Sequence, residues 1–334
     1  MKKITFFDNL RLVGCVAVVL IHSIGPYREQ IGKIPDYEWA MAIGLNGSLR
    51  WAVPVFIMIT GALMLSDTRK FDLNYFIKRR VFKVFIPFLV WSLFFTVLSG
   101  LTSAGFEYDI FLSTLKNLYH HEAYYHLGFF YYFIPLYFII PFLRYMVQTN
   151  TENNSVEFII LIWLVLTLMY LLSIQGFWTN DLFMYGGFLL LGYYLYLNKN
   201  LNILFFCLLG LVSLIISNYF VLKDSFISQT YDIGLWFSYK TLNTVLIATM
   251  IFLIVCQLSG YISIKLQKKL SLIGKYSLGI YLIHPLFLWP TRNYDIYIGP
   301  TIFNILLWGI ISFTLSFVTV HFLSKLQMTR WLVP

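Results

Sequence analysis

An arginine and a histidine in one apolar segment near the N-terminus have the types and the spacing for proton and charge chemistry. Arg11 and His22 are close to three helical turns apart, so they share a face, with His22 about 16 Å further along the axis. Asp8 precedes Arg11 by one turn and can pair with it. An imidazole can take a proton from a hydroxyl group or attack as a nucleophile, and the sequence leaves both roles open. The inert alternative is a His22 bonded to a neighbouring helix and an Arg11 that extends to the membrane surface.

Similar chemistry is available in a second apolar segment, near the C-terminus. His284 lies near the middle of that segment, and Tyr281 shares its face because it precedes His284 by one helical turn. Both can line one cavity with His22. Ionisable side chains are costly inside an apolar segment, which makes each of them a functional candidate. The alternatives are a hydrogen-bonded structural histidine beside a kink at Pro285 and ordinary helix packing for Tyr281.

The elements that position these residues have a bilayer as their solvent. Of the 334 residues, 59% are hydrophobic and 12% are charged, whereas soluble domains carry about 25% charged residues. We therefore expect one integral membrane domain over residues 1–334 and no separate soluble domain. The basic residues are spread through short loops, so no nucleic-acid partner is expected. The three cysteines fall inside apolar segments without metal-type spacing, so we expect neither a metal site nor a disulfide framework.

The hydropathy pattern predicts an all-α polytopic membrane protein. A spanning segment needs roughly 20 mostly apolar residues, and in lipid its backbone groups must bond within the segment, which favours helices. We predict about ten transmembrane helices, at 10–27, 48–65, 82–101, 127–146, 156–174, 181–197, 201–222, 241–259, 276–291 and 300–324.

The distribution of lysine and arginine predicts the orientation of these helices, because basic residues concentrate in cytoplasmic loops. With the N-terminus inside, the outer loops contain only Arg28, Lys33, Lys116, Lys223, Lys240 and Arg292. Most of the other basic residues fall in inner segments, including Lys2, Lys3, Lys199 and two basic loops at 66–80 and 260–275. Both termini are therefore predicted to be cytoplasmic. The long outer loop 102–126 contains the segment FLSTLKNLYHH, which can form a helix on the membrane surface.

Five motifs follow one another along the chain in a recognisable order. They are FDNLR with Arg11-x10-His22, SLRWAVPVFIMITGALML (48–65) with Arg50, KRRVFKVFIPFLVW (78–91) with Arg80-x-x-Lys83, YYHLGFFYYFIPLYFIIPFLR (124–144), and YSLGIYLIHPL (276–286). In this order they resemble the signature of the membrane acyltransferase-3 family, which acylates bacterial surface polysaccharides. The resemblance covers the chain from end to end.

Three positions depart from the family pattern. Gly128 replaces the usual Trp, Thr60 replaces a usual Ser, and Lys83 stands where Arg is commoner. Gly128 puts an aromatic contact in doubt, whereas Lys83 can still meet a phosphate, although without bidentate geometry. Some relatives append a soluble esterase-like domain, which we do not find here. We therefore expect the membrane domain itself to complete the transfer.

The resemblance implies a membrane O-acyltransferase, an O-acetyltransferase if the acyl group is acetyl, in the bacterial cytoplasmic (inner) membrane. Its donor would be cytoplasmic acyl-CoA, with acetyl-CoA as a substrate and no permanently bound cofactor. The acceptor would be a hydroxyl of a cell-surface or lipid-linked glycan, such as O-antigen, common antigen or an exopolysaccharide. Catalysis would involve His22, Arg11, His284 and Tyr281.

Further charged residues fit the two substrates of such a reaction. Arg79, Arg80 and Lys83 suit the phosphates of a CoA nucleotide, although ordinary cytoplasmic anchoring is the alternative, most of all for Arg79. Arg50 and His126 are predicted at the outer surface, where they can meet the acceptor sugar or the phosphate of its lipid carrier. Interfacial anchoring of Arg50 and a solvated loop-end role for His126 are the alternatives. Asp8 joins the substrate-binding candidates through its pairing with Arg11.

A different class of function competes with this interpretation. A carrier or flippase for a glycan or lipid-linked sugar would also place histidine and arginine inside a helical bundle. A glycan carrier needs no cytoplasmic phosphate clamp, so the basic cluster at 78–83 favours the transferase.

Overall fold

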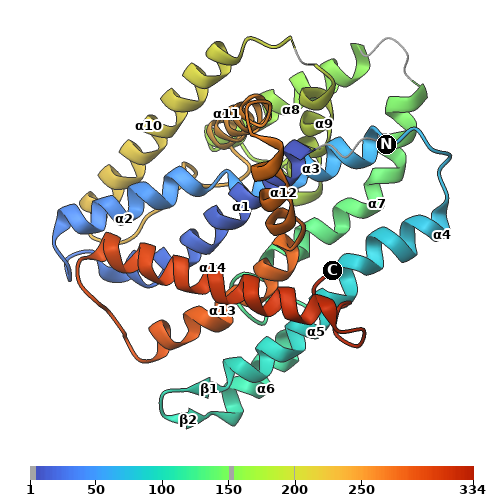
Figure 1. Ribbon diagram of the computed structural model, residues 1–334. Coiled ribbons are helices and arrows are strands. Elements are labelled where there is room, and N and C mark those ends of the chain that lie inside the picture. The colour runs from blue at the N-terminus through green and yellow to red at the C-terminus, as the bar shows by residue number, and fades with distance from the viewer. Residues whose placement is uncertain (1–4, 150–153, 199) are drawn as a thin grey trace.

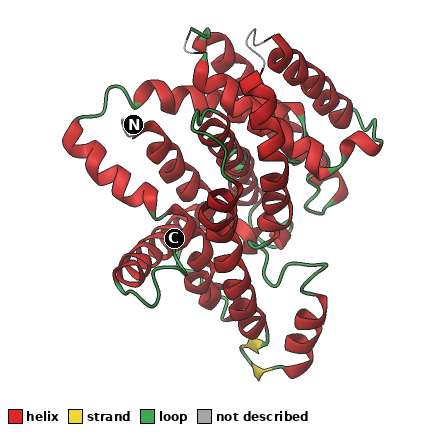
Figure 2. Cartoon of the chain, turned by 90° about the vertical axis from the view of Figure 1, so that its right-hand side faces the viewer, coloured by secondary structure: helices red, strands yellow, loops and turns green. Residues whose placement is uncertain are grey.

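The computed structural model describes residues 5–149, 154–198 and 200–334, and this part of the chain is a bundle of helices (Figure 1). The strands described in it are β1 (Leu101–Thr102) and β2 (Gly105–Phe106), which form a short antiparallel hairpin. Figure 2 shows that this hairpin and helix α6 (Tyr108–Asn117) project from one end of the bundle. The predicted all-α class is confirmed.

Each of the ten predicted spans contains a helix. In chain order these helices are α1 (Thr5–Ile24), α3 (Ala52–Leu65), α5 (Phe82–Ser99), α7 (Gly128–Thr149), α8 (Asn154–Leu171), α9 (Asp181–Leu197), α10 (Ile203–Ser228), α11 (Leu242–Leu258), α13 (Ser277–Asn293) and α14 (Thr301–Lys325). The remaining elements are the 3-10 turns η1 (Gly25–Gln30) and η3 (Phe177–Thr179), helices α2 (Asp36–Leu49), α4 (Leu73–Phe76) and α12 (Ile264–Lys275), and the π-helical turn η2 (Ile77–Val81).

The described helices include six long and apolar enough to cross a membrane, or seven if α12 and α13 act as one bent span. Helices α8, α9 and α11 are apolar but shorter. The protein is therefore a multi-pass α-helical membrane protein, while the count of ten and the side of each terminus stay predictions. Lys2, Lys3 and Lys199, which we assign to the inner side, lie outside the described residues.

Three segments expected to be loops are largely helical. The first is the outer segment between the predicted spans 10–27 and 48–65, which contains α2. The basic loop 260–275 contains α12, which begins after the N-cap Ser263 and buries Gln267 and Ser271. Its lysines lower the hydropathy of the segment, so the amphipathic pattern was read as a loop. The other basic loop, 66–80, contains α4 and η2. The surface segment predicted in the loop 102–126 corresponds to α6, and its position relative to a membrane stays a prediction.

Helix α9 is buried over most of its length and crosses α3 at very short range. A Cβ atom added to Gly192 would lie 2.1 Å from the carbonyl oxygen of Met58, and one added to Gly61 would lie 2.0 Å from that of Leu189. Small residues at helix crossings let backbones approach closely in membrane proteins, where van der Waals packing is a main attraction. Two glycines on opposite sides of one contact therefore hold α3 against α9.

Helix α1, which carries Arg11 and His22, is held by the C-terminal helices. It packs against α12, α13 and α14 (Figure 1). A Cβ atom on Gly274 of α12 would lie 2.2 Å from the carbonyl oxygen of Asp8. The amide of Asn9 donates to Oε1 of Gln267 over 3.0 Å, and this contact is buried. The bent α12–α13 pair therefore sets the position of α1.

Candidate active site

A cavity of about 210 Å³ lies beside His22, and we call it the histidine cavity. Five separate parts of the chain line it: Val18, Ile21 and His22 of α1, Val53 of α3, Tyr125, His126, Gly128, Phe129 and Tyr132 at the start of α7, Tyr239 before α11, and Tyr281 of α13. Aromatic rings form much of this wall. The cavity is therefore an apolar enclosure with a small number of polar groups, as in many ligand sites.

Three histidines from distant parts of the chain meet beside this cavity. His22 and His126 line it, whereas His284 contacts both of their rings but does not line the cavity as expected. The ring centroids of His22 and His284 are 5.1 Å apart, and those of His126 and His284 are 5.6 Å apart. His126 and His284 are fully buried, with 1% and 0% of their surface exposed. The predicted proximity of His22 and His284 is present in the structure. His126 joins them and lies buried, so the solvated loop-end role does not hold.

Backbone carbonyls bind one ring nitrogen of each buried histidine. Nδ1 of His284 lies 2.7 Å from the carbonyl oxygen of Tyr281, and Nε2 of His126 lies 3.3 Å from that of Leu282. A nitrogen that faces a carbonyl must carry the proton, because the carbonyl can only accept. The opposite nitrogens, Nε2 of His284 and Nδ1 of His126, are buried without a hydrogen-bond partner among the described residues. Each ring therefore presents a lone pair that can accept a proton.

Tyr281 connects the two segments that carry these histidines. Its hydroxyl donates a hydrogen bond to the carbonyl oxygen of His126, while its own carbonyl accepts from His284. Its ring lines the cavity. Tyr281 is therefore bonded to the backbone of His126 through its hydroxyl and to the ring of His284 through its carbonyl.

A second cavity, of about 150 Å³, lies near the Arg11 end of α1, and we call it the basic cavity. Arg80 lines it and interacts electrostatically with Arg11. Nη1 of Arg11 lies 3.0 Å from a carboxylate oxygen of Asp8, as the sequence spacing suggested. The lining residues are Met64, Asp67, Arg69, Lys70, Phe71, Asp72, Tyr75, Phe76, Arg80, Ile140 and Arg144.

The structure separates the three residues expected to bind the donor phosphates. Arg80 lines the basic cavity, whereas Arg79 is exposed on the π-helical turn η2 and lines neither cavity. Lys83 is exposed one turn further along and interacts electrostatically with Arg80 and Arg11. A π-helical turn adds a residue to the helix and is frequent at functional sites. Neighbouring side chains of a helix point about 100° apart, so Arg80 lines the cavity while Arg79 does not.

Sequence reasoning missed Arg144 as a site residue. It is buried, donates to the carbonyl oxygen of Arg69, and stacks on Phe71 at 5.6 Å. Asp67 accepts from Arg69, and this hydrogen bond lowers the pKa of the Asp67 carboxyl to about 2. Arg144 closes the fourth motif, and its place in an inner loop made it resemble an ordinary anchor.

Arg292 was missed at the other end of the site. One of its terminal nitrogens donates to the carbonyl oxygen of His22 over 3.0 Å, and its guanidinium lies 3.9 Å from the ring centre of Tyr125. Arg292 follows His284 by about two helical turns, so it lies on the same side of α13. The spacing of Arg292 from His284 is the sequence feature that indicates a shared site. A basic residue at the end of a transmembrane span, however, usually anchors the helix at the membrane surface.

Arg50 lies next to the histidine cavity rather than in its wall. Its guanidinium stacks on Tyr239, a lining residue, at 4.7 Å and donates to the carbonyl oxygen of Phe237. The two cavities have no lining residue in common. Within the described ranges, no group of three His, Cys, Asp or Glu residues is arranged to hold a metal ion.

The chain matches a family model described as an acyltransferase domain over residues 4–323. No curated protein and no solved structure matches it. The family match covers nearly the whole chain and includes both cavities and the helix that joins their ends. The chain therefore belongs to the acyltransferase-3 family of membrane acyltransferases.

Proposed function

We propose that this protein is an O-acetyltransferase of the bacterial cytoplasmic membrane. It moves an acetyl group from cytoplasmic acetyl-CoA to a hydroxyl of a cell-surface or lipid-linked glycan. The observation that supports this most is the histidine cavity, which His22 and His126 line, with His284 in contact with both of their rings. The buried rings of His126 and His284 each keep one nitrogen without a partner among the described residues. An apolar enclosure with several imidazoles suits the transfer of an uncharged acyl group and a proton.

The basic cavity is the proposed docking site of the donor nucleotide. Arg69, Lys70, Arg80 and Arg144 line it, and guanidinium groups bind phosphate oxygens through paired hydrogen bonds. In this proposal the pantetheine arm extends along α1 from the Arg11 end toward His22, about 16 Å away.

Two routes of transfer fit the geometry. In the first, His22 takes the proton of the sugar hydroxyl, the hydroxyl oxygen attacks the thioester carbonyl, and CoA leaves as a thiol after receiving the proton. In the second, a nitrogen of His22 attacks the thioester, CoA leaves, and the sugar hydroxyl then takes the acyl group from the acyl-imidazole. In this second route CoA leaves as the thiolate, and His284, with its ring 5.1 Å from that of His22, accepts the proton of the sugar hydroxyl. That proton and the thiolate together make up the thiol product.

Transfer of radiolabel from acetyl-CoA to a glycan acceptor by the purified protein tests this proposal. His22→Ala is expected to lower the rate by at least about a hundredfold, as for loss of a general base. His321→Ala is the matched control, because this histidine of α14 contacts Tyr276 and lines neither cavity. Wild-type transfer by His22→Ala would show that the assignment of His22 is wrong.

The surface polysaccharide gives an independent test in cells. Mass analysis with and without this protein is expected to differ by one acyl mass per modified sugar, and the size of that mass identifies the acyl group. A carrier or flippase would instead change the amount of glycan and not its acylation. Membership of an acyltransferase family favours the transferase over that alternative.

A further inference from the structure

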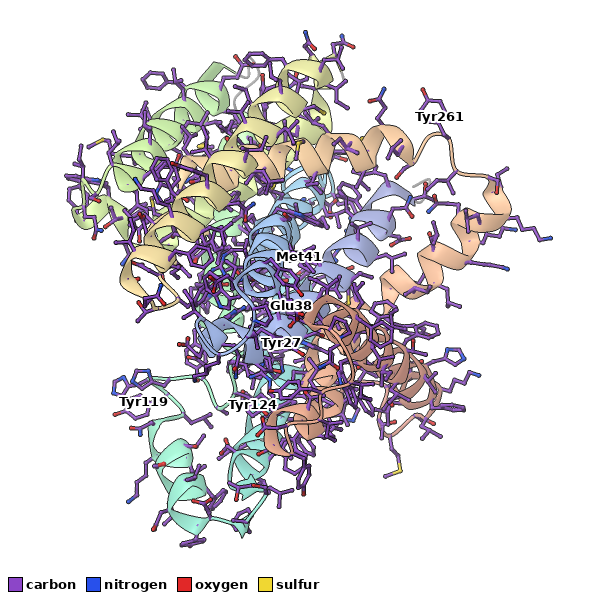
Figure 3. All side chains as sticks on the ribbon, turned by 90° about the vertical axis from the view of Figure 1, so that its left-hand side faces the viewer. Tyr27, Glu38, Met41, Tyr119, Tyr124 and Tyr261 are labelled. Atoms are coloured by element: carbon purple, nitrogen blue, oxygen red, sulfur yellow. The ribbon has the colours of Figure 1, made fainter. Side chains whose placement is uncertain are left out.

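Three arginines gather at the end of the bundle where α1, α2 and α13 finish. Arg28 belongs to η1, Arg50 follows α2, and Arg292 lies in the last turn of α13. The charge of Arg28 interacts with those of Arg50 and Arg292. Figure 3 labels Tyr27 of η1, which precedes Arg28 in the sequence, and Tyr124 of the segment before α7. We call these three residues the arginine cluster.

The positive charges of the arginine cluster have no carboxylate partner among the described residues. The ion pairs found in residues 5–149, 154–198 and 200–334 all involve other side chains. Aromatic rings support the guanidinium groups instead, with Arg50 4.7 Å from the centre of Tyr239 and Arg292 3.9 Å from that of Tyr125. Like charges that are drawn together repel one another, and an anion between them would remove that cost.

Each arginine of the cluster uses a backbone carbonyl to fix its position. Arg28 donates to the carbonyl oxygen of Ile21, Arg50 to that of Phe237, and Arg292 to that of His22. A guanidinium has five N–H donors, so most of its donors remain. The Nε atoms of Arg28 and Arg292 are buried and have no hydrogen-bond partner in the described part of the chain. Rigidly held donors without acceptors are what a bound oxyanion requires.

The arginine cluster adjoins the histidine cavity through the rings on which it stacks. Tyr125 and Tyr239 line that cavity, and the ring centre of Tyr125 is 4.7 Å from that of His22. The hydroxyl of Tyr125 is buried without a partner in the described residues, so it adds another donor at this boundary. A group held by the arginines would therefore lie one aromatic ring away from His22.

We propose that the arginine cluster binds a phosphate group at the end of the histidine cavity opposite the basic cavity. The site suits a phosphate or a phosphate ester, because three planar guanidinium forks can pair with its oxygens. The proposal rests on the proposed function in one respect only, the identity of the group attached to the phosphate. If the protein is an acyltransferase, that group is the acceptor, and its hydroxyl faces His22. Phosphate binding itself does not depend on transfer.

Thermal unfolding of the full chain in an uncharged maltoside detergent tests the site with three probes. The probes are polyprenyl phosphate, the neutral polyprenol of the same length, and inorganic phosphate. Polyprenyl phosphate is expected to raise Tm in a saturable way, while polyprenol leaves it unchanged. If inorganic phosphate also raises Tm, the phosphate group alone is recognised. If inorganic phosphate leaves Tm unchanged, the site binds a lipid phosphate.

Variants of the cluster connect this effect to the arginines. Arg28→Gln and Arg50→Gln are each expected to weaken polyprenyl phosphate binding by about tenfold, as for loss of a charged hydrogen bond. Arg28→Lys keeps the charge but loses the fork, so it should fall between Arg28→Gln and the wild type. Lys223→Gln is the control, because this exposed lysine stacks on Phe220, away from the cavity. The Tm of each variant without ligand reports whether it folds.

The outcomes separate this site from the proposed function. The phosphate site would be overturned if polyprenol and polyprenyl phosphate raised Tm equally. It would also be overturned if Arg28→Gln and Arg50→Gln both folded and bound polyprenyl phosphate as the wild type does. A different result would uphold the site and refute the transferase. In that result, polyprenyl phosphate binding depends on the arginines both in the wild type and in His22→Ala, but the wild type transfers no acyl group.

Discussion

The ring nitrogens of His126 and His284 illustrate how single residues acquire a chemical role. Each ring faces a backbone carbonyl on one side and keeps an unpartnered nitrogen on the other, among the residues described. Both rings are buried, and a buried polar atom without a hydrogen bond is costly, so each nitrogen favours a partner that enters beside it. The same residue types on an exposed loop, such as His120 and His121 beside α6, have no comparable environment.

Arg79 and Arg80 form a matched pair for testing the donor site. Arg80 lines the basic cavity and Arg79 is exposed, although they are neighbours with the same charge. We expect Arg80→Gln to raise the KM for acetyl-CoA by about tenfold with little change in kcat, because ground-state phosphate binding is lost. Arg79→Gln should leave both constants near the wild-type values. Equal effects of the two changes would contradict the assignment of Arg80.

Asp67 predicts a dependence of stability on pH. Its hydrogen bonds with Arg69 lower the pKa of this carboxyl from an ordinary 3.8 to about 2. A lowered folded-state pKa contributes stability that is present above the ordinary pKa and is lost as the pH falls through the folded value. Asp67→Asn should therefore lower Tm at neutral pH, and its difference from the wild type should shrink between about pH 4 and pH 2. If the Tm difference between Asp67→Asn and the wild type stayed constant from about pH 4 to pH 2, the ion pair of Asp67 with Arg69 would not be the cause of that difference.

At the scale of elements, helix contacts through glycine determine which faces meet. The crossing of α3 and α9 depends on Gly61 and Gly192, and the contact of α1 with α12 depends on Gly274. These contacts place α1 beside α13 and so bring His22 to His284. The sequence shows each glycine, but not the backbone that it meets.

The α3–α9 crossing gives a prediction for stability. Gly192→Ala puts a methyl group 2.1 Å from the carbonyl oxygen of Met58, so the two helices must separate. We expect a loss of about 1–3 kcal/mol, measured as a lower Tm in detergent. Gly44→Ala is the matched control in α2, because a Cβ there meets nothing within 4 Å. It should be neutral or stabilising, since Ala favours a helix more than Gly.

At the scale of the whole molecule, the two cavities lie at different ends of one bundle. Arg80 borders one and His22 the other, and no residue lines both. This arrangement fits a protein that receives its substrates from opposite sides of a membrane. The predicted topology puts the basic cavity on the cytoplasmic side.

Cysteine labelling tests this orientation. Tyr119, between α6 and α7, is 76% exposed, and Met328, beyond α14, is 85% exposed. With both termini inside, a membrane-impermeant maleimide should label Tyr119→Cys in intact spheroplasts and Met328→Cys only after permeabilisation. The unsubstituted protein controls for reaction at Cys15, Cys207 and Cys256. The reverse labelling pattern would invert the topology.

The sequence alone determined the features that depend on neighbours along the chain. Hydropathy predicted the all-α class and a helix in every proposed span, and spacing placed Arg11 beside Asp8. These features follow from helical periodicity, which acts over a few turns. The same local reasoning misread 260–275 as a loop, because the lysines of α12 hide its buried face.

Only the tertiary structure decided which helices meet. His126 lies more than a hundred residues from both His22 and His284. Its ring joins theirs because α13 packs against α1 and the segment before α7 bonds to α13 through Leu282. The basic cavity likewise needs Arg144 of α7 to reach the loop after α3. Such contacts depend on close backbone approach and shape complementarity between distant segments, and no periodicity along one chain encodes them.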